Sequence, residues 1–127
     1  MIQMTNVELL AAGQSLRELA AERLPIEGAL RVRRVIREVQ GPLDDTEAVR
    51  QELLRRHGKV GEDGRPVLDE QGNVKFDGDG LKRFQADYTE LMAQTVEIEQ
   101  VVRVADLGSI EIAPAVLMGL GALLEEE

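Results

Sequence analysis

The sequence contains no cysteine and no tryptophan, and it has only three aromatic residues, Phe76, Phe84 and Tyr88, among 127. Without cysteine, neither a disulfide nor a thiolate metal site can form, and this composition is typical of cytosolic proteins. Aromatic side chains supply the platforms on which the bases of single-stranded nucleic acids stack. Their scarcity argues against nucleic acid as a partner and predicts a core built from aliphatic side chains.

Histidine is equally scarce. His57 is the only one, and no serine or cysteine neighbours it in the sequence, so neither a His-rich metal site nor a nucleophile–base pair is indicated. The DGDG segment at 77–80 resembles the start of a calcium loop. The positions where an EF-hand needs an oxygen ligand or a glycine hold Leu81, Lys82 and Tyr88 instead. We therefore expect a helix-capping turn at 77–80, and no catalytic residue, metal or cofactor.

Long apolar runs are absent as well. The longest, AVLMGLGALL at 115–124, is about half the roughly 20 residues that a membrane-spanning helix needs. The first ten residues, MIQMTNVELL, lack the basic start and the apolar stretch of a signal peptide. We therefore expect neither a membrane association nor secretion.

The net charge of −9 is spread unevenly along the chain. Residues 25–57 hold seven basic and six acidic side chains, whereas residues 58–127 hold six basic and fifteen acidic ones. An acidic second half repels a phosphate backbone and favours a protein partner with a basic surface. The alternative is an acidic surface that serves only to keep the protein soluble.

Apolar residues recur at helical spacing over most of the chain and predict four helices, at 7–23, 26–57, 80–94 and 114–124. Asn6 is a suitable N-cap for the first helix. The second helix has a stripe of Ala29, Val32, Ile36 and Val39 that keeps its phase across residues 41–42, Gly-Pro. This favours one long, kinked helix over two separate ones.

Short strands are expected at 2–5 and 96–99, and residues 110–112 are expected to form either a second short strand or an extended link. Extended segments at 65–68 and 73–76 flank a glycine-containing turn and predict a β-hairpin. No internal repeat is apparent. The fold class is therefore α+β: a helix-dominated single domain, 1–127, with about four helices, a central β-hairpin and a few short strands. Residues 59–79 form a hairpin and loop insertion between helices.

A basic run, RVRRVIR at 31–37, lies in the second predicted helix. Acidic residues four positions away are expected to pair with two of its arginines, Glu27 with Arg31 and Glu38 with Arg34. These pairs alone would neutralise only part of the run.

Arg33 and Arg37 are different, because they lie four residues apart on one helix face with no acid three or four residues away. Two guanidinium groups in this arrangement repel each other unless an anion meets them. That anion is either the acidic half of the same chain, an acidic patch of another protein or a ligand phosphate. Arg33 and Arg37 are therefore candidate binding residues.

Two further segments are candidates for contact with partners. The hairpin exposes polar side chains around its turn, and the last helix is apolar almost all round, as expected of a helix covered by the domain itself or by a second copy. The hairpin candidates are Arg65, Gln71, Asn73 and Lys75. The candidate oligomer interface comprises Val116, Leu117, Met118, Leu120 and Leu123.

The order of segments resembles a family of small accessory proteins of unknown function encoded by tailed phages. The matching stretches are Leu9…Ala12…Leu16…Leu19, Leu24-Pro25, Leu53-Leu54…His57-Gly58, DEQGNVKF at 69–76 and DLGSIEIAPAVLMGL at 106–120. The likeness covers nearly the whole chain, although Gly13, Gly28, Gly119 and Gly121 are many glycines for helices. The family has no assigned catalytic residues, so none is carried over. The resemblance implies a phage accessory role in the host cytoplasm or the virion.

These observations lead us to expect a non-enzymatic, phage-encoded interaction protein that binds and modulates a host or phage protein, for example as an inhibitor of host defence. One alternative is a structural virion or tail-assembly component acting as a homo-oligomer through the last helix. A further alternative is a sponge for an anionic nucleotide signal, held by the arginines.

Overall fold

The structure, a computed structural model, describes residues 1–126. Within them the chain forms four α-helices and small two-stranded sheets, so the predicted helix-dominated α+β fold is confirmed. The chain divides into two compact units. The first comprises residues 1–44 together with the chain from Gln94 onward, and the second comprises residues 45–93.

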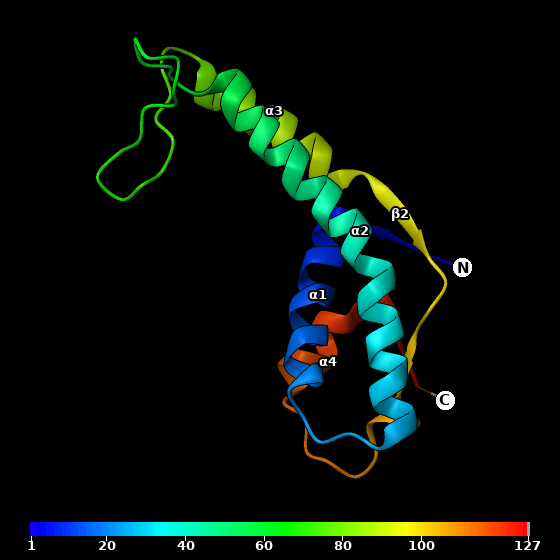
Figure 1. The fold of residues 1–127 in the computed structure, drawn as a ribbon. Coiled ribbons are helices and arrows are strands. Elements are labelled where there is room, and N and C mark those ends of the chain that lie inside the picture. The colour runs from blue at the N-terminus through cyan, green and yellow to red at the C-terminus, as the bar shows by residue number, and fades with distance from the viewer. Residues whose placement is uncertain (127) are drawn as a thin grey trace. The chain divides into compact units, whose positions relative to one another are not determined.

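The first unit combines helices with short strands, and α1 and the first part of α2 run side by side in it (Figure 1). In chain order its elements are β1 (Ile2–Thr5), α1 (Asn6–Ala20), the first part of α2 (Ile26–His57), β2 (Thr95–Ile98), β3 (Val102–Arg103), η1 (Val104–Leu107), α4 (Pro114–Leu120), η2 (Gly121–Leu123) and β4 (Leu124–Glu125), with η marking 3-10 helices.

The strands of the first unit form two separate pairs. β1 and β2 are antiparallel, with Ile2 opposite Ile98 and Thr5 opposite Thr95. β3 and β4 are parallel, with Val102 opposite Leu124. Of the two alternatives for residues 110–112, the structure has the extended link, because those residues pair with no strand among residues 1–126 and β3 pairs with residues 124–125 instead.

A capping box starts α1. The Thr5 side chain accepts a hydrogen bond from the Glu8 amide at 3.2 Å, and the Glu8 carboxylate accepts one from the Thr5 amide at 3.0 Å. This is the reciprocal arrangement of the T-x-x-E motif. The prediction of Asn6 as N-cap is wrong by one residue, since Asn6 is already helical and buried whereas the backbone of Thr5 is still extended.

The core of the first unit is aliphatic, as the shortage of aromatics predicts. α4 packs against α1, and Gly119 lets the two helices approach closely, because a Cβ atom at Gly119 would lie 2.0 Å from the Ser15 hydroxyl. The residues with at most 1% exposure are Met4, Leu9, Ala12, Leu16, Leu19, Val32, Val35, Val39, Ile98, Val102, Leu120 and Leu123.

α2 is one continuous helix that contains Pro42, so the predicted continuity through the Gly-Pro pair is confirmed. A proline disfavours the helical conformation of the residue before it, mainly through a clash with that residue's Cβ atom. Gly41 has no Cβ and can therefore stay helical. α2 supplies residues to both units, since the division falls between Asp44 and Asp45.

The second unit consists of the later part of α2, a long loop and α3 (Gly80–Ala93). All three aromatic residues meet here in one row, with ring centroids 5.5 Å apart for Phe76 and Phe84 and 5.6 Å apart for Phe84 and Tyr88. His57, at the end of α2, lies with Nε2 2.7 Å from Oδ2 of Asp87 on α3. The aromatic row packs the loop on α3, and the His57–Asp87 hydrogen bond joins α3 to α2.

The loop between α2 and α3 closes on itself through a ring of backbone hydrogen bonds. The Lys59 amide donates to the Lys75 carbonyl (2.7 Å), the Lys75 amide to the Val67 carbonyl (2.9 Å), and the Val67 amide to the Lys59 carbonyl (2.9 Å). The three positions are eight residues apart. The predicted hairpin lies within this ring, as an antiparallel bridge between Leu68 and Val74.

The same eight-residue spacing recurs in three turns, at 61–64, 69–72 and 77–80. In each, the amide of the last residue, a glycine, donates to the carbonyl of the first, at 2.9 to 3.1 Å. Gly64 and Gly72 both have positive φ, which explains why glycine occupies these positions. The expectation that the chain lacks an internal repeat is therefore wrong. The repeat units have few residue types in common beyond these glycines, and what recurs is the pattern of backbone hydrogen bonds.

Candidate protein-binding groove

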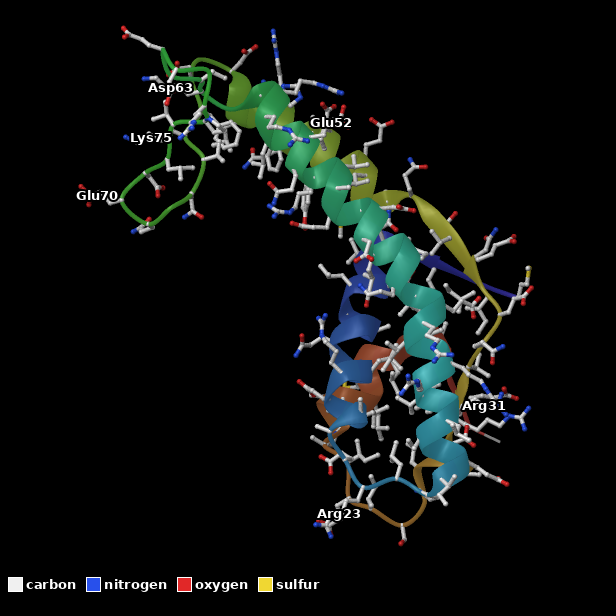
Figure 2. The ribbon with its side chains drawn as sticks, in the orientation of Figure 1. Arg23, Arg31, Glu52, Asp63, Glu70 and Lys75 are labelled. Atoms are coloured by element: carbon white, nitrogen blue, oxygen red, sulfur yellow. The ribbon has the colours of Figure 1, made fainter. Side chains whose placement is uncertain are left out.

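A groove of about 550 Å³ lies on the first unit, between the end of α1, the link at 21–25 and the first turns of α2. Figure 2 shows Arg23 on this link and Arg31 further along α2. The lining is mainly aliphatic, and its charged residues are Glu22 and Arg33. The aliphatic residues are Ala20, Leu24, Ile26, Ala29, Leu30, Val32 and Ile36.

The groove exists because α2 has two apolar stripes. Val32, Val35 and Val39 are at most 1% exposed and pack into the core. The second stripe lies beside them, with Ile26 82% exposed and Leu30 47% exposed. The described residues thus leave most of Ile26 and about half of Leu30 uncovered, and exposed apolar residues that lie together often mark a binding surface.

Arg33 and Arg37 continue the second stripe, at positions three and seven residues beyond Leu30. Both side chains are exposed, and neither forms an ion pair with any carboxylate of residues 1–126. Arg33 lines the groove itself, and Arg37 lies one helical turn further along. The structure thus places the two sequence-predicted arginines next to exposed aliphatic side chains.

Two other charged residues of this part of α2, Arg31 and Glu38, have partners far away in the sequence. Arg31 pairs with Asp106, with Nε 3.7 Å from Oδ2. The Glu38 carboxylate accepts hydrogen bonds from the backbone amides of Glu99 and Gln100, each at 2.7 Å. The expected pairs within the helix, Glu27 with Arg31 and Glu38 with Arg34, do not form, because partners from η1 and from the segment after β2 replace them.

The predicted hairpin residues form a separate surface, on the second unit. Arg65, Gln71, Asn73 and Lys75 are all exposed. Their turn is held by Asp69, whose carboxylate accepts from the backbone amides of Gln71 at 2.8 Å and Asn73 at 2.9 Å. Figure 2 shows Glu70 at the tip of this loop and Lys75 on its returning side. The six candidate binding residues therefore divide between two surfaces.

The candidate oligomer residues lie on α4 and η2, and most of them face the core of their own chain. Leu120 and Leu123 are fully buried, and Val116 and Leu117 are partly buried against the core. Met118 alone among the five is strongly exposed, at 80%. A homo-oligomer through the last helix remains a prediction, and Met118 is the residue through which it would act.

Of the residues that line the groove, only Arg33 is predicted as a binding residue from the sequence, and the exposed Ile26 and Leu30 are not. The signal was present, because Ile26, Leu30, Arg33 and Arg37 follow one another at spacings of four, three and four residues, which is one helix face. Ala29 and Ile36 were instead assigned to the core stripe. Ile36 does pack partly on the core, but it also lines the groove.

The described residues offer few groups for chemistry. Within residues 1–126 no three His, Asp or Glu side chains gather in a way that would hold a metal ion. Hydrogen bonds from Arg50 and Gln51 lower the pKa of Glu47 to about 2, and hydrogen bonds from Thr5 lower the pKa of Glu8. Both carboxylates lie on helix surfaces away from the groove lining, and both shifts have a local structural cause.

No family model, curated protein or solved structure matches this chain. None of the helices in residues 1–126 is long and apolar enough to cross a membrane. Function must therefore be inferred from the surfaces of the molecule, and above all from the groove and its two arginines.

Proposed function

We propose that this protein is a non-enzymatic, phage-encoded interaction protein that binds and modulates a protein of the host or the phage. The observation that carries the proposal is the exposed pair Ile26 and Leu30 beside Arg33 in the groove. Burying an aliphatic side chain of this size contributes about 1.5–3 kcal/mol. Two such anchors contribute at most about 3–6 kcal/mol, which offsets only part of the roughly 4–15 kcal/mol cost of association. The arginines and the rest of the groove must therefore contribute to any stable interface.

The chemistry of the groove suits binding better than catalysis. Aliphatic side chains transfer no protons, and a guanidinium group keeps its proton at any physiological pH. Arginine is, however, among the residues that contribute most at protein interfaces, together with large side chains that fill a pocket. The groove therefore supports recognition of another surface.

A second surface of opposite charge supports a partner with a basic region. Residues 58–80 hold six acidic and three basic side chains, and the acidic ones lie in or beside the three turns of the repeat. Complementary charge speeds association and orients the partner more than it strengthens the complex. We propose that this loop steers basic partners, whereas the groove supplies most of the binding energy.

The phage origin and a location in the host cytoplasm or the virion are part of the proposal and follow from the family resemblance. A second candidate function is a sponge for an anionic nucleotide, which the unpaired state of Arg33 and Arg37 among residues 1–126 favours. A thermal-shift screen with nucleotides tests it. Stabilisation that disappears in R33E/R37E would support the sponge, and no shift at about 1 mM nucleotide would exclude it.

Affinity capture from phage-infected host cells tests the leading proposal. The wild-type protein should recover a specific protein that R33E/R37E recovers poorly. The matched control is R34E/R55E, which makes the same change in charge at two exposed arginines that do not line the groove. If both double variants lose the protein equally, or if neither they nor the wild type recovers one, the proposal fails. Recovery only from purified virions would favour the assembly role.

A further inference from the structure

We infer that the occupant of the groove is an amphipathic helix of a different protein, with aliphatic residues on one face and Asp or Glu beside them. This inference rests on the proposed function and names the class of partner. The surface is the groove itself together with Ile26, Leu30, Arg33 and Arg37 of α2.

The spacing of the exposed stripe matches a helical partner. Its four residues alternate in steps of four and three, the pattern by which one helix packs along another. From Ile26 to Arg37 the stripe is about 16 Å long at 1.5 Å per residue. A partner helix of about three turns would cover it, and a short amphipathic helix seated in an apolar groove is a common mode of peptide recognition.

The charges of the stripe define the chemistry of the partner. Arg33 lines the groove and Arg37 lies one helical turn beyond it on α2, whereas Glu22 lines the groove from the link that follows α1. A carboxylate placed opposite each arginine would make charge-assisted hydrogen bonds that no residue among 1–126 provides. The partner helix should therefore carry its acidic residues toward the Arg33 and Arg37 end and its aliphatic residues over Ile26 and Leu30.

A second copy of this chain fits the stripe poorly. Parallel packing of two identical α2 stripes would place Arg33 and Arg37 opposite the same arginines of the other copy. Like charges at an interface disfavour association. Antiparallel packing would place these arginines against Leu30 and Ile26, where no carboxylate meets them. A small-molecule ligand fits poorly as well, because such sites enclose most of their ligand whereas Ile26 on the wall of the groove is 82% exposed.

The direct test uses two synthetic helical peptides of fourteen residues, with leucines at spacings of three and four and with either Glu or Lys at the flanking positions. Fluorescence anisotropy measures their binding to the full-length protein. We expect the Glu peptide to bind wild type about tenfold more tightly than the Lys peptide, and R33E/R37E to reverse this preference. The R34E/R55E variant should, like the wild type, bind the Glu peptide more tightly than the Lys peptide. Equal binding of the two peptides, or no binding of the Glu peptide at about 1 mM, would overturn the inference.

A parallel measurement separates failure of the inference from failure of the proposed function. A photo-reactive amino acid in place of Leu30 is activated in infected cells, and the cross-linked peptide is identified by mass spectrometry. A cross-link to an acidic helical segment supports the inference. A cross-link to a basic, extended or nucleic-acid segment overturns the inference but leaves the interaction role standing. If neither position 30 nor a second probe at Gln71 cross-links to any protein, the proposed function fails too.

Discussion

The carboxylate of Glu38 binds the backbone amides of Glu99 and Gln100 at once, with both hydrogen bonds 2.7 Å long. These residues are more than 60 positions apart in the sequence. The contact fixes the first half of α2 to the segment that follows β2. It thereby keeps Val35 and Val39 in the core and leaves the stripe from Ile26 to Arg37 on the surface.

Loss of the Glu38 carboxylate should destabilise the first unit. Glu38→Ala removes two charge-assisted hydrogen bonds and leaves two backbone amides without their acceptor, at an expected cost of about 2 kcal/mol. Glu38→Gln keeps one acceptor oxygen and should cost about half as much. Urea denaturation followed by circular dichroism measures both variants. A Glu38→Ala variant as stable as wild type would show that this contact does not hold α2 in place.

A methyl group at Gly28 should be poorly tolerated. A Cβ atom there would lie 1.7 Å from the Asp106 carbonyl oxygen, so the backbone of η1 would have to move away from α2. We expect Gly28→Ala to cost about 2–3 kcal/mol. Gly13→Ala is the matched control, because its Cβ atom would meet only the end of the Leu43 side chain, at 2.9 Å, and alanine is the better helix former by about 1 kcal/mol.

Thermal melting compares these two glycine variants. The predicted order is a clear fall in the melting temperature for Gly28→Ala and little change for Gly13→Ala. Equal effects at the two positions would contradict the close packing of α2 against η1.

Asp69 should hold the eight-residue repeat together. Asp69→Ala removes the acceptor for the amides of Gln71 and Asn73, which should weaken the loop by about 1 kcal/mol. Hydrogen exchange of the amides of Lys59, Val67 and Lys75 should then become several-fold faster. Glu70→Ala, at the exposed tip, is the control and should leave these rates unchanged. If these amides exchange at unchanged rates in Asp69→Ala, the ring of backbone hydrogen bonds does not depend on the turn that Asp69 holds.

The lowered pKa of Glu47 predicts how the stability of the folded state changes with pH. Its hydrogen bonds from Arg50 and Gln51 lower its pKa from 4.5 to about 2. A carboxyl group with a lowered pKa in the folded state stabilises that state fully above pH 4.5, and this contribution is lost as the pH falls toward 2. The contribution is small, about 0.5 kcal/mol, because the Glu47 side chain is 56% exposed.

An NMR titration of the Glu47 carboxyl carbon tests this directly. The midpoint should lie below pH 4.5 in the wild-type protein and should rise toward 4.5 in Arg50→Gln, where the main hydrogen-bond donor is lost. A midpoint near 4.5 in wild type would show that the Glu47–Arg50 pair does not persist in solution.

Helices were predicted well from the sequence because their signals are local. Hydrophobic periodicity predicted the positions of α1, α3 and α4. The apolar stripe of α2 keeps its helical phase across Pro42, which predicted one continuous helix. The sequence left residues 110–112 open between a strand and an extended link because a strand exists only through its partner, and β3 pairs with residues 124–125 instead. The eight-residue repeat escaped notice because it is a property of backbone hydrogen bonds rather than of side chains.

For the candidate site, too, local sequence patterns were informative, whereas contacts with distant residues could not be predicted. Arg33 and Arg37 stood out because no acid lies three or four residues away on the helix. Their neighbours Arg31 and Glu38 were paired wrongly, since their actual partners come from 61 to 75 residues further along the chain. The exposure of Ile26 and Leu30 depends on what the rest of the chain leaves uncovered, which no local pattern reveals.

Hydrogen–deuterium exchange of the complex with the captured partner tests the central claim most directly, namely that the protein acts by presenting the groove to another protein. We predict slower exchange in residues 20–37, the segment that contains Leu24, Leu30 and Arg33, and little change at 80–93. Protection confined to the loop at 59–79, or no protection in 20–37 at saturating partner, would contradict the account.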